Sequence, residues 1–318
     1  MDRVTASRLP AWLGLGGAAL IGVLTAVQAR INGQLGVRID DGFAAAVISF
    51  GSGLVVLVVL SAALPQGRRG FAALITGVRG GGIPIWMLGG GVAGALSVAT
   101  QSLAVGIIGV ALFTVGVVAG QTLSGLLLDR SGIGPAGVVA VTPARLAGGA
   151  LALLAAGVSL AGGIHAPPVL VVLPFLVGAG IAWQSAVNGR LRQRVGTPLT
   201  ATLVNFIGGT AVLGVAELIH TAVAGPPTSY PSDPWLYLGG VIGVAYIFLA
   251  AALVPHTGVL LLGLGTVVGQ VVTSVVIDAI WPAVGAPAPA ASLLMSTLAI
   301  LSVVVAVVPW RRMPRGRR

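Results

Sequence analysis

The sequence contains no cysteine and no lysine, and only 8% of its residues are charged. Without cysteine the chain has no disulfide, no thiol nucleophile and no thiolate metal site. A soluble domain carries about 25% charged residues because its surface must be hydrated, and this chain cannot supply such a surface. Hydrophobic residues make up 56% of it, and its mean hydropathy is +1.05. We therefore expect lipid to cover most of the molecule, as in an integral membrane protein.

The chain also lacks the common catalytic and metal-binding motifs. It has no phosphate-binding loop, no His-Glu-x-x-His and no plausible serine–histidine arrangement, and His165, His220 and His256 lie far apart. The net charge of +10 comes from arginines in short clusters without interleaved aromatic residues, a distribution that does not indicate nucleic-acid binding. We expect no catalytic residue, no cofactor, no metal and no nucleic-acid partner.

Two blocks of sequence occur twice. Residues 28–35, QARINGQL, return at 184–191 as QSAVNGRL, and both copies read Gln-x3-Asn-Gly-x-Leu. The pair Gly120-Gln121, followed by Asp129, returns as Gly269-Gln270, followed by Asp278 at the same spacing. An internal duplication decides the architecture before any single element is assigned. It predicts two related halves, residues 1–164 and 165–318.

Ten apolar stretches approach the roughly 20 residues that cross a bilayer as a helix. Their predicted ranges are 10–30, 42–64, 83–102, 105–128, 143–163, 168–188, 199–221, 234–253, 257–280 and 291–310. Proline- and glycine-rich breaks separate them, the first at Pro65-Gln66-Gly67. Thr142 is expected as the N-cap of the helix that starts with Pro143, which places Arg145 near the membrane interface, where it can snorkel. The predicted fold class is all-α and integral to the membrane.

The arginines predict the orientation of these helices. With the N-terminus in the cytoplasm, all 17 arginines except Arg30 and Arg38 fall in segments on the cytoplasmic side, as the positive-inside rule requires. Both termini are then cytoplasmic, in a bacterial-type cytoplasmic (inner) membrane. Each half carries five helices, an odd number, so the second half enters the membrane from the opposite face. The two halves are predicted to form an inverted repeat.

Amide side chains are the main candidate functional groups. Gln28 and Asn32 lie four residues apart, as do Gln184 and Asn188, so each pair shares one helix face. A buried amide is costly unless its hydrogen bonds are satisfied. These pairs either line a substrate path or gate, or they join helices to each other, and the repeat fits both interpretations. The candidate path residues are Gln28, Asn32, Gln101, Gln121, Gln184, Asn188 and Gln270.

Two repeated aspartates are candidates for coupling transport to protons. Asp129 and Asp278 end apolar helices, and ionisable groups in spanning segments are candidate functional groups. The alternative is that each carboxylate caps a helix or anchors a loop. The coupling role, with a proton as the coupling ion, is a hypothesis for both residues.

The repeated motifs resemble the YdcZ-type branch of the drug/metabolite transporter superfamily. Its hallmarks resemble Gln28 to Leu35, then Phe50 to Gly53, and Gly120-Gln121 followed by Leu128-Asp129-Arg130-Ser131-Gly132. The second half departs from the pattern after Asp278, where Ala279-Ile280-Trp281-Pro282 follows. The resemblance covers nearly the whole chain and implies a fused pair of five-helix units. It further implies a ten-helix bundle that moves a small molecule by secondary transport or facilitated export.

The leading hypothesis is a secondary transporter with a central cavity between the halves, working by alternating access on a small organic substrate, neutral or weakly charged. A lipid or lipid-linked carrier flippase on the same fold is the first alternative. It needs a cationic cavity, to which only Arg30, Arg38, Arg145, Arg190 and Arg194 could contribute. A non-transporting membrane scaffold is the second alternative and predicts tightly packed amides without a cavity. An intramembrane enzyme is disfavoured. Membrane lipids are expected partners in every case.

Overall fold

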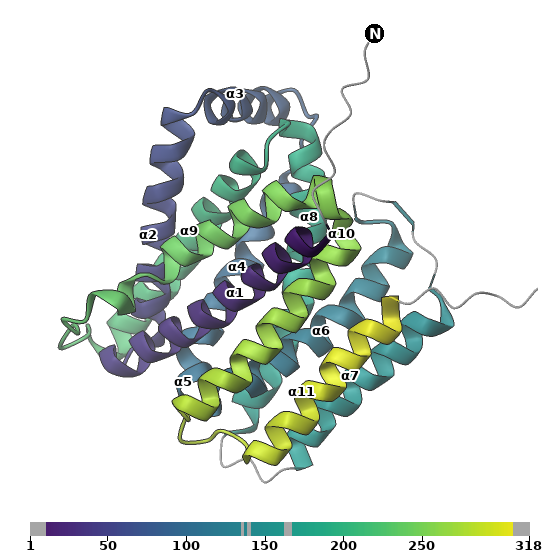
Figure 1. The fold of residues 1–318 in the computed structure, drawn as a ribbon. Coiled ribbons are helices and arrows are strands. Elements are labelled where there is room, and N and C mark those ends of the chain that lie inside the picture. The colour runs from purple at the N-terminus through teal and green to yellow at the C-terminus, as the bar shows by residue number, and fades with distance from the viewer. Residues whose placement is uncertain (1–10, 135–136, 139–140, 162–166, 308–318) are drawn as a thin grey trace, which may run out of the picture.

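All regular structure in the described part of the chain is helical (Figure 1). The computed structural model describes residues 11–134, 137–138, 141–161 and 167–307. The α-helices are α1 (Ala11–Ile39), α2 (Gly42–Ala63), α3 (Pro65–Arg79), α4 (Gly90–Thr100), α5 (Gly106–Ile108), α6 (Val110–Ser131), α7 (Pro143–Ala161), α8 (Pro168–Val195), α9 (Pro198–Ala224), α10 (Gly239–Ile280) and α11 (Pro289–Val307). The short 3₁₀ helices η1 (Ile85–Leu88) and η3 (Pro234–Tyr237) precede α4 and α10, and the π-helical turn η2 (Gln101–Val105) follows α4. The predicted all-α fold class is confirmed.

Six helical segments in the described residues are long and apolar enough to cross a membrane. They are Leu13–Ile39, Gly42–Ala63, Ile85–Ile108, Val110–Ser131, Pro168–Val195 and Pro198–Ala224. Shorter apolar helices occupy Pro143–Ala155, Gly239–Ala250, Gly265–Ile280 and Pro289–Val305. These segments match the ten predicted stretches one for one. The largest difference is in the first, which runs on to Ile39 rather than ending at residue 30.

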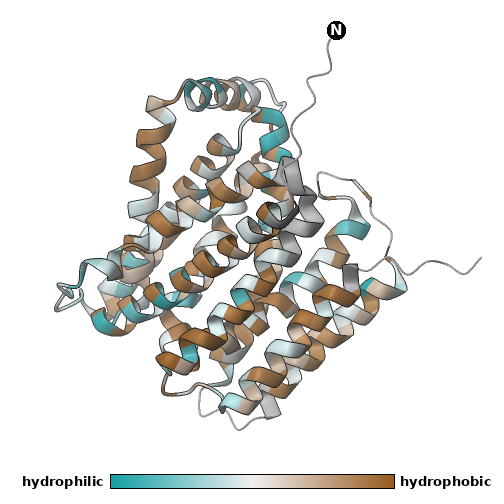
Figure 2. Ribbon diagram, in the orientation of Figure 1, coloured by the Kyte–Doolittle hydropathy of each residue, from teal (hydrophilic) through white to brown (hydrophobic). Residues whose placement is uncertain are grey.

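The outer surface of the bundle is apolar. Val55, Leu127, Leu218 and Val223 are exposed by 64, 71, 70 and 85%, and Figure 2 shows hydrophobic residues along most of the helices. An exposed apolar surface of this extent marks a protein that contacts other molecules or a membrane. Lipid contact is its simplest explanation in a chain with so few charges.

The long helix α10 consists of two limbs that run in opposite directions along α1 (Figure 1). In the first limb Gly243 lies against Gln28 and, further along, Leu253 lies against Gly17, so this limb is antiparallel to α1. In the second limb Gly265 lies against Ala18 and Trp281 against Arg30, so this limb is parallel to α1. The chain therefore reverses between Leu253 and Gly265, close to the division between the predicted ranges 234–253 and 257–280.

The segment after α2 is a helix, where the sequence analysis expected a break. Pro65 begins α3 at its first turn, a position that tolerates proline because the amide there has no helical partner anyway. Gly67, Gly70 and Leu74 form its buried face, with Gly70 against Thr197 and Thr200. Figure 1 shows α3 lying across the end of the bundle rather than along it.

Local chemistry sets several helix ends. The side chain of Asp41 accepts hydrogen bonds from the amides of Phe43 and Ala44 and caps α2. Thr142 accepts one from the amide of Arg145 at 3.3 Å, which agrees with its predicted N-cap role. Gly132, at φ +69°, ends α6 in the left-handed conformation that glycine adopts without strain.

The two halves interlock rather than lie side by side. α1 packs mainly on α10, α8 on α6 and α4, α2 on α9, and α7 on α11. At the α2–α9 contact the rings of Phe50 and Phe206 stack with centroids 4.8 Å apart. Elsewhere, helices in a membrane pack closely through small residues, because lipid offers no hydrophobic driving force between helices.

Matching positions of the two halves make matching contacts. Gly90, the first residue of α4, faces the side-chain oxygens of Asn188 and Asn205. Its counterpart Gly239, the first residue of α10, faces those of Asn32 and Ser49. The close-contact pairs Gly91–Asn205 and Gly240–Ser49, Gly94–Gln184 and Gly243–Gln28, and Gly178–Val117 and Gly22–Thr266 repeat the same relation. Each first helix thus packs on the opposite half in the same way.

Candidate functional site

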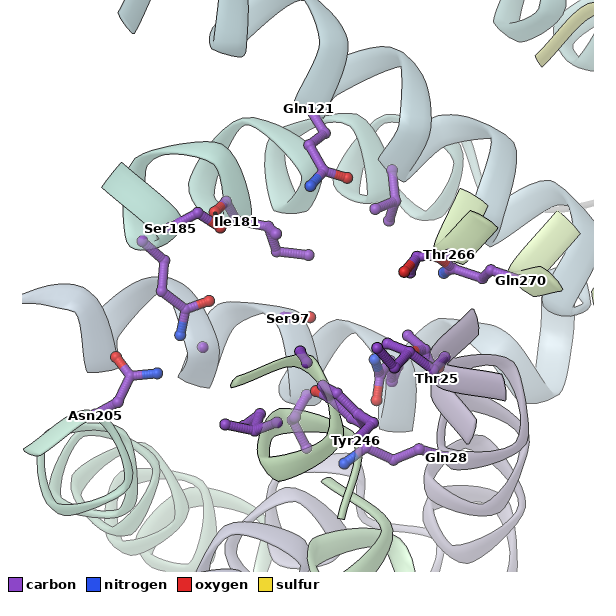
Figure 3. A pocket seen from close by; sticks show the side chains of 18 of the residues that line it. Thr25, Gln28, Ser97, Gln121, Ile181, Ser185, Asn205, Tyr246, Thr266 and Gln270 are labelled. Carbon is purple, nitrogen blue, oxygen red and sulfur yellow. Dashed lines mark hydrogen bonds between the residues drawn. The ribbon is translucent and has the colours of Figure 1, made fainter. Parts of the chain in front are cut away.

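A cavity of about 800 Å³ lies between the two halves (Figure 3). Helices from both halves contribute to its wall, which is mainly apolar with hydroxyl and amide groups at intervals. The polar residues that line it are Thr25, Gln28, Ser49, Ser97, Gln101, Gln121, Thr122, Arg145, Gln184, Ser185, Asn188, Thr202, Asn205, Tyr246, Thr266 and Gln270. A cavity of this size and character is typical of small-molecule sites.

Six of the seven path residues predicted from sequence line this cavity. They are Gln28, Gln101, Gln121, Gln184, Asn188 and Gln270, and Figure 3 shows Gln121 across the cavity from Gln28. Asn32 does not line it. The side chain of Asn32 is fully buried and donates from Nδ2 to Oε1 of Gln101 at 2.7 Å. Asn32 therefore positions the side chain of Gln101 without lining the cavity itself.

Gln28 is fixed by a contact with the other half. Its Nε2 donates to the carbonyl oxygen of Gly239 at 2.8 Å, where α10 begins. This bond uses part of the amide for helix packing and leaves the rest of the side chain at the cavity wall. The side chain of Gln28 thus both lines the cavity and joins two helices.

Asn205 is a lining residue that the sequence analysis missed. Its side chain is 6% exposed and its Oδ1 has no hydrogen-bond partner. Asn205 precedes Phe206, the counterpart of Phe50, and matches Ser49 in the first half. A polar residue at this place in both halves was the available signal. The unpartnered oxygen is enclosed next to Gly90, while the residue contributes to the cavity wall.

Asp129 forms an ion pair with Arg145, its neighbour from α7. Oδ2 of Asp129 lies 2.6 Å from Nη1 of Arg145, and the two side chains are 39 and 31% exposed. Arg145, which was expected at the interface as a snorkelling residue, pairs with Asp129 and lies in the cavity wall. Asp129 itself does not line the cavity.

Asp278 joins the second limb of α10 to the start of α6. Its two carboxylate oxygens accept hydrogen bonds from the amides of Val110 and Ala111 at 2.9 and 2.7 Å, and the residue is 9% exposed. A carboxylate at a helix N-terminus satisfies free amides and favours the positive end of the helix dipole. The capping role that the sequence analysis considered for Asp278 is present in this conformation. The guanidinium of Arg30 lies near it, 4.7 Å from the centroid of the Trp281 ring.

The other arginines that a phosphate-binding cavity would need lie elsewhere. Arg38 pairs with Asp233 at 3.6 Å in an exposed position. Arg190 and Arg194 line a separate small pocket, and Arg190 donates to the carbonyl oxygen of Gly132. Arg145 is thus the one member of that set of five that lines the cavity. The flippase alternative loses most of its expected charge, and the cavity itself disfavours a tightly packed scaffold.

One group of possible metal ligands occurs in the described residues, outside the cavity. Asp41, Glu217 and His220 bring their ligand atoms within 4.8 Å of one another. The sequence spacing did not reveal the group, because Asp41 precedes α2 and the other two residues lie on α9. Nδ1 of His220 lies 3.0 Å from Asp41, and Glu217 accepts a hydrogen bond from Thr221. The contact between Asp41 and His220 links the start of α2 to α9, whereas Oε2 of Glu217 is buried without a hydrogen-bond partner among the described residues.

Comparisons with known proteins agree with the repeated sequence. A family described as "Putative inner membrane exporter, YdcZ" matches the chain twice, at residues 13–160 and 169–309. None of the curated proteins matches. A solved structure described only as a crystal structure of a protein has 21% sequence identity and a TM-score of 0.52, covering 96% of this chain and 100% of its own. That likeness concerns the fold. The chain therefore belongs to the YdcZ-type family of drug/metabolite transporters, as a fused form with two copies of the family unit.

Proposed function

We propose that this protein is a secondary transporter that exports a small organic molecule across the inner membrane by alternating access. The observation that carries the proposal is the cavity of about 800 Å³, whose wall is built from matching positions of both halves. Gln28 and Gln184, Gln121 and Gln270, and Phe50 and Phe206 are such pairs. A site at the interface of two repeats is where transporters of this architecture bind their substrates.

The matching contacts also support an inverted arrangement of the halves. Apart from α3, which only the first half has, the helices of the two halves follow in the same order, and each first helix packs on the other half through equivalent glycines. With the arginine distribution, this favours ten crossings, both termini in the cytoplasm and a pseudo-two-fold axis in the membrane plane. Two such repeats can exchange conformations, which opens the cavity to one side and then to the other.

The present conformation fits a cavity directed toward the cytoplasm. Its lining reaches Arg145 near the start of α7 and Val303 near the end of α11, which the predicted orientation places on the cytoplasmic side. At the opposite end Asp278 binds the start of α6 and closes the bundle. Release of this capping contact would accompany opening to the outside.

The proposal is tested by ligand binding followed by flux. The purified protein is screened against a metabolite and drug library by thermal shift at two pH values, since a ligand of the native state raises the melting temperature. Hits are then measured for flux in proteoliposomes. We expect Gln184→Leu to reduce binding of a hit about tenfold or more, because it removes a polar contact from the cavity. Gln193→Leu, an exposed position on the same helix, serves as the control and should leave binding unchanged.

Proton coupling is tested in the same vesicles. Asp129→Asn should abolish flux driven by a pH gradient while the protein stays folded. Unchanged flux would remove Asp129 from the mechanism. A library without any hit that depends on Gln184 would overturn the proposal that this cavity binds substrate.

A further inference from the structure

We propose that the cavity selects organic acids, and that Arg145 binds the carboxylate of the substrate in place of Asp129. This inference rests on the proposed function, since it assigns a substrate class to the same cavity. It narrows the expected neutral or weakly charged substrate to a singly charged anion with an apolar body.

The charges of the cavity wall favour an anion. Arg145 is the one ionised group at neutral pH among the described residues that line it, and these include no carboxylate. Asp129, which pairs with Arg145, is not among the lining residues, so a cation entering this space would meet the guanidinium and no carboxylate in the wall, in surroundings that screen charge less than water does. A single positive group therefore discriminates between acids and amines of the same shape.

Arg145 is held in a geometry that an incoming carboxylate can take over. Among the described residues, its Nη1 contacts one oxygen, Oδ2 of Asp129, at 2.6 Å. Both side chains keep about a third of their surface exposed, so the pair is accessible to solvent and can exchange partners. A guanidinium donates two parallel hydrogen bonds to a carboxylate. The carboxylate of a substrate would therefore take the place of the Asp129 carboxylate. Asp129 then competes with the substrate carboxylate for the guanidinium of Arg145.

The rest of the wall suits the body of such a substrate. Ile21, Phe113, Val117, Ile181 and Ile247 provide apolar surface. The amides of Gln121 and Gln184 provide hydrogen bonds without charge. A molecule with one acidic end, an apolar core and a hydrogen-bond donor would match this pattern.

A matched ligand series separates charge from shape. Arylalkanoates of increasing size are compared with their primary amides and the corresponding amines, using thermal shift and equilibrium binding to the full-length protein in detergent. We expect the acids to bind about tenfold or more tightly than their amides, the usual size of a charge-assisted hydrogen bond, and the amines to bind weakest. Arg145→Gln should abolish the preference, while Arg190→Gln, which removes an arginine outside the cavity, should preserve it.

A second variant predicts a change in the opposite direction. Asp129→Asn removes the competing carboxylate and should tighten binding of the acids several-fold without changing binding of the amides. Tighter binding of the acids cannot come from misfolding. It therefore tests the inference even if Arg145→Gln does not fold. Amides or amines that bind as well as acids would overturn the inference and leave the transporter proposal standing. Failure of all three series, together with failure of the broad library, would overturn both.

Discussion

At two symmetry-related positions, glycine brings backbones of the two halves into direct contact. A Cβ atom on Gly91 would lie 2.6 Å from the amide nitrogen of Gly209, and one on Gly240 would lie 2.5 Å from that of Gly53. Backbone cannot swing aside as a flexible side chain can. These contacts explain why glycine is needed where α4 meets α9 and where α10 meets α2.

We predict that Gly91→Ala and Gly240→Ala each destabilise the protein by about 1–3 kcal/mol, the usual cost of overpacking. Gly51→Ala and Gly214→Ala are the controls, because nothing lies within 4 Å of a Cβ at either position. These two should be neutral or slightly stabilising, since alanine favours a helix more than glycine does. Thermal unfolding in detergent measures all four. Equal losses in the two pairs would show that the close contacts do not matter.

Among the elements, α3 has the surface of a helix that lies along a membrane. Phe71, Ile75 and Val78 share one exposed stripe and are 41, 39 and 37% exposed. Arg69 is exposed away from this stripe, and Arg68, at the start of the helix, donates a hydrogen bond to the carbonyl oxygen of Ala62. The element lies across the end of the bundle (Figure 1), and its polar and apolar faces are typical of interfacial helices. Under the predicted orientation it lies at the cytoplasmic surface.

Spin labels can test the placement of α3, because the chain has no native cysteine to remove. We predict that labels at Phe71→Cys and Ile75→Cys collide more with oxygen, which concentrates in lipid. A label at Arg69→Cys should collide more with a water-soluble relaxation agent. Electron paramagnetic resonance in proteoliposomes measures both. The same water accessibility at all three positions would place the helix clear of the bilayer.

At the scale of the whole molecule, neither half has a complete set of contacts by itself. α1 packs mainly on α10, and α8 mainly on α6 and α4. The first helix of each half therefore packs mainly on the other half. The hydrogen bond from Gln28 to Gly239 and the capping contact of Asp278 also cross between the halves. The sequence division at residues 164–165 is therefore not expected to separate two independently folding domains.

We predict that residues 1–164 and 165–318, expressed alone, are unstable and degraded, whereas the co-expressed halves associate and co-purify. Size-exclusion chromatography and thermal unfolding of the co-purified halves provide the measurement, with the intact chain as control. A half that is monodisperse and folded alone would contradict the interlocked arrangement.

Some features of the site followed from sequence patterns and others did not. The amides of Gln28, Gln184, Gln121 and Gln270 were identifiable because an uncharged polar residue repeated in an apolar helix stands out. Asn205 was missed because its counterpart is Ser49, a residue that is common in helices of any kind. Asn32 was expected at the path on the same grounds as Asn188, yet it lies behind Gln101.

The sequence by itself determined the class of the protein and its duplication. Low charge excludes a hydrated surface, apolar runs of bilayer length define the helices, and the repeated motifs define two related halves. These are properties of composition and local pattern. Only the tertiary structure decided which side chains meet: that Arg145 pairs with Asp129 at the cavity, that Asp278 caps α6, and that each first helix packs on the opposite half. Such contacts join residues far apart in the chain through helix packing, which residue spacing does not encode.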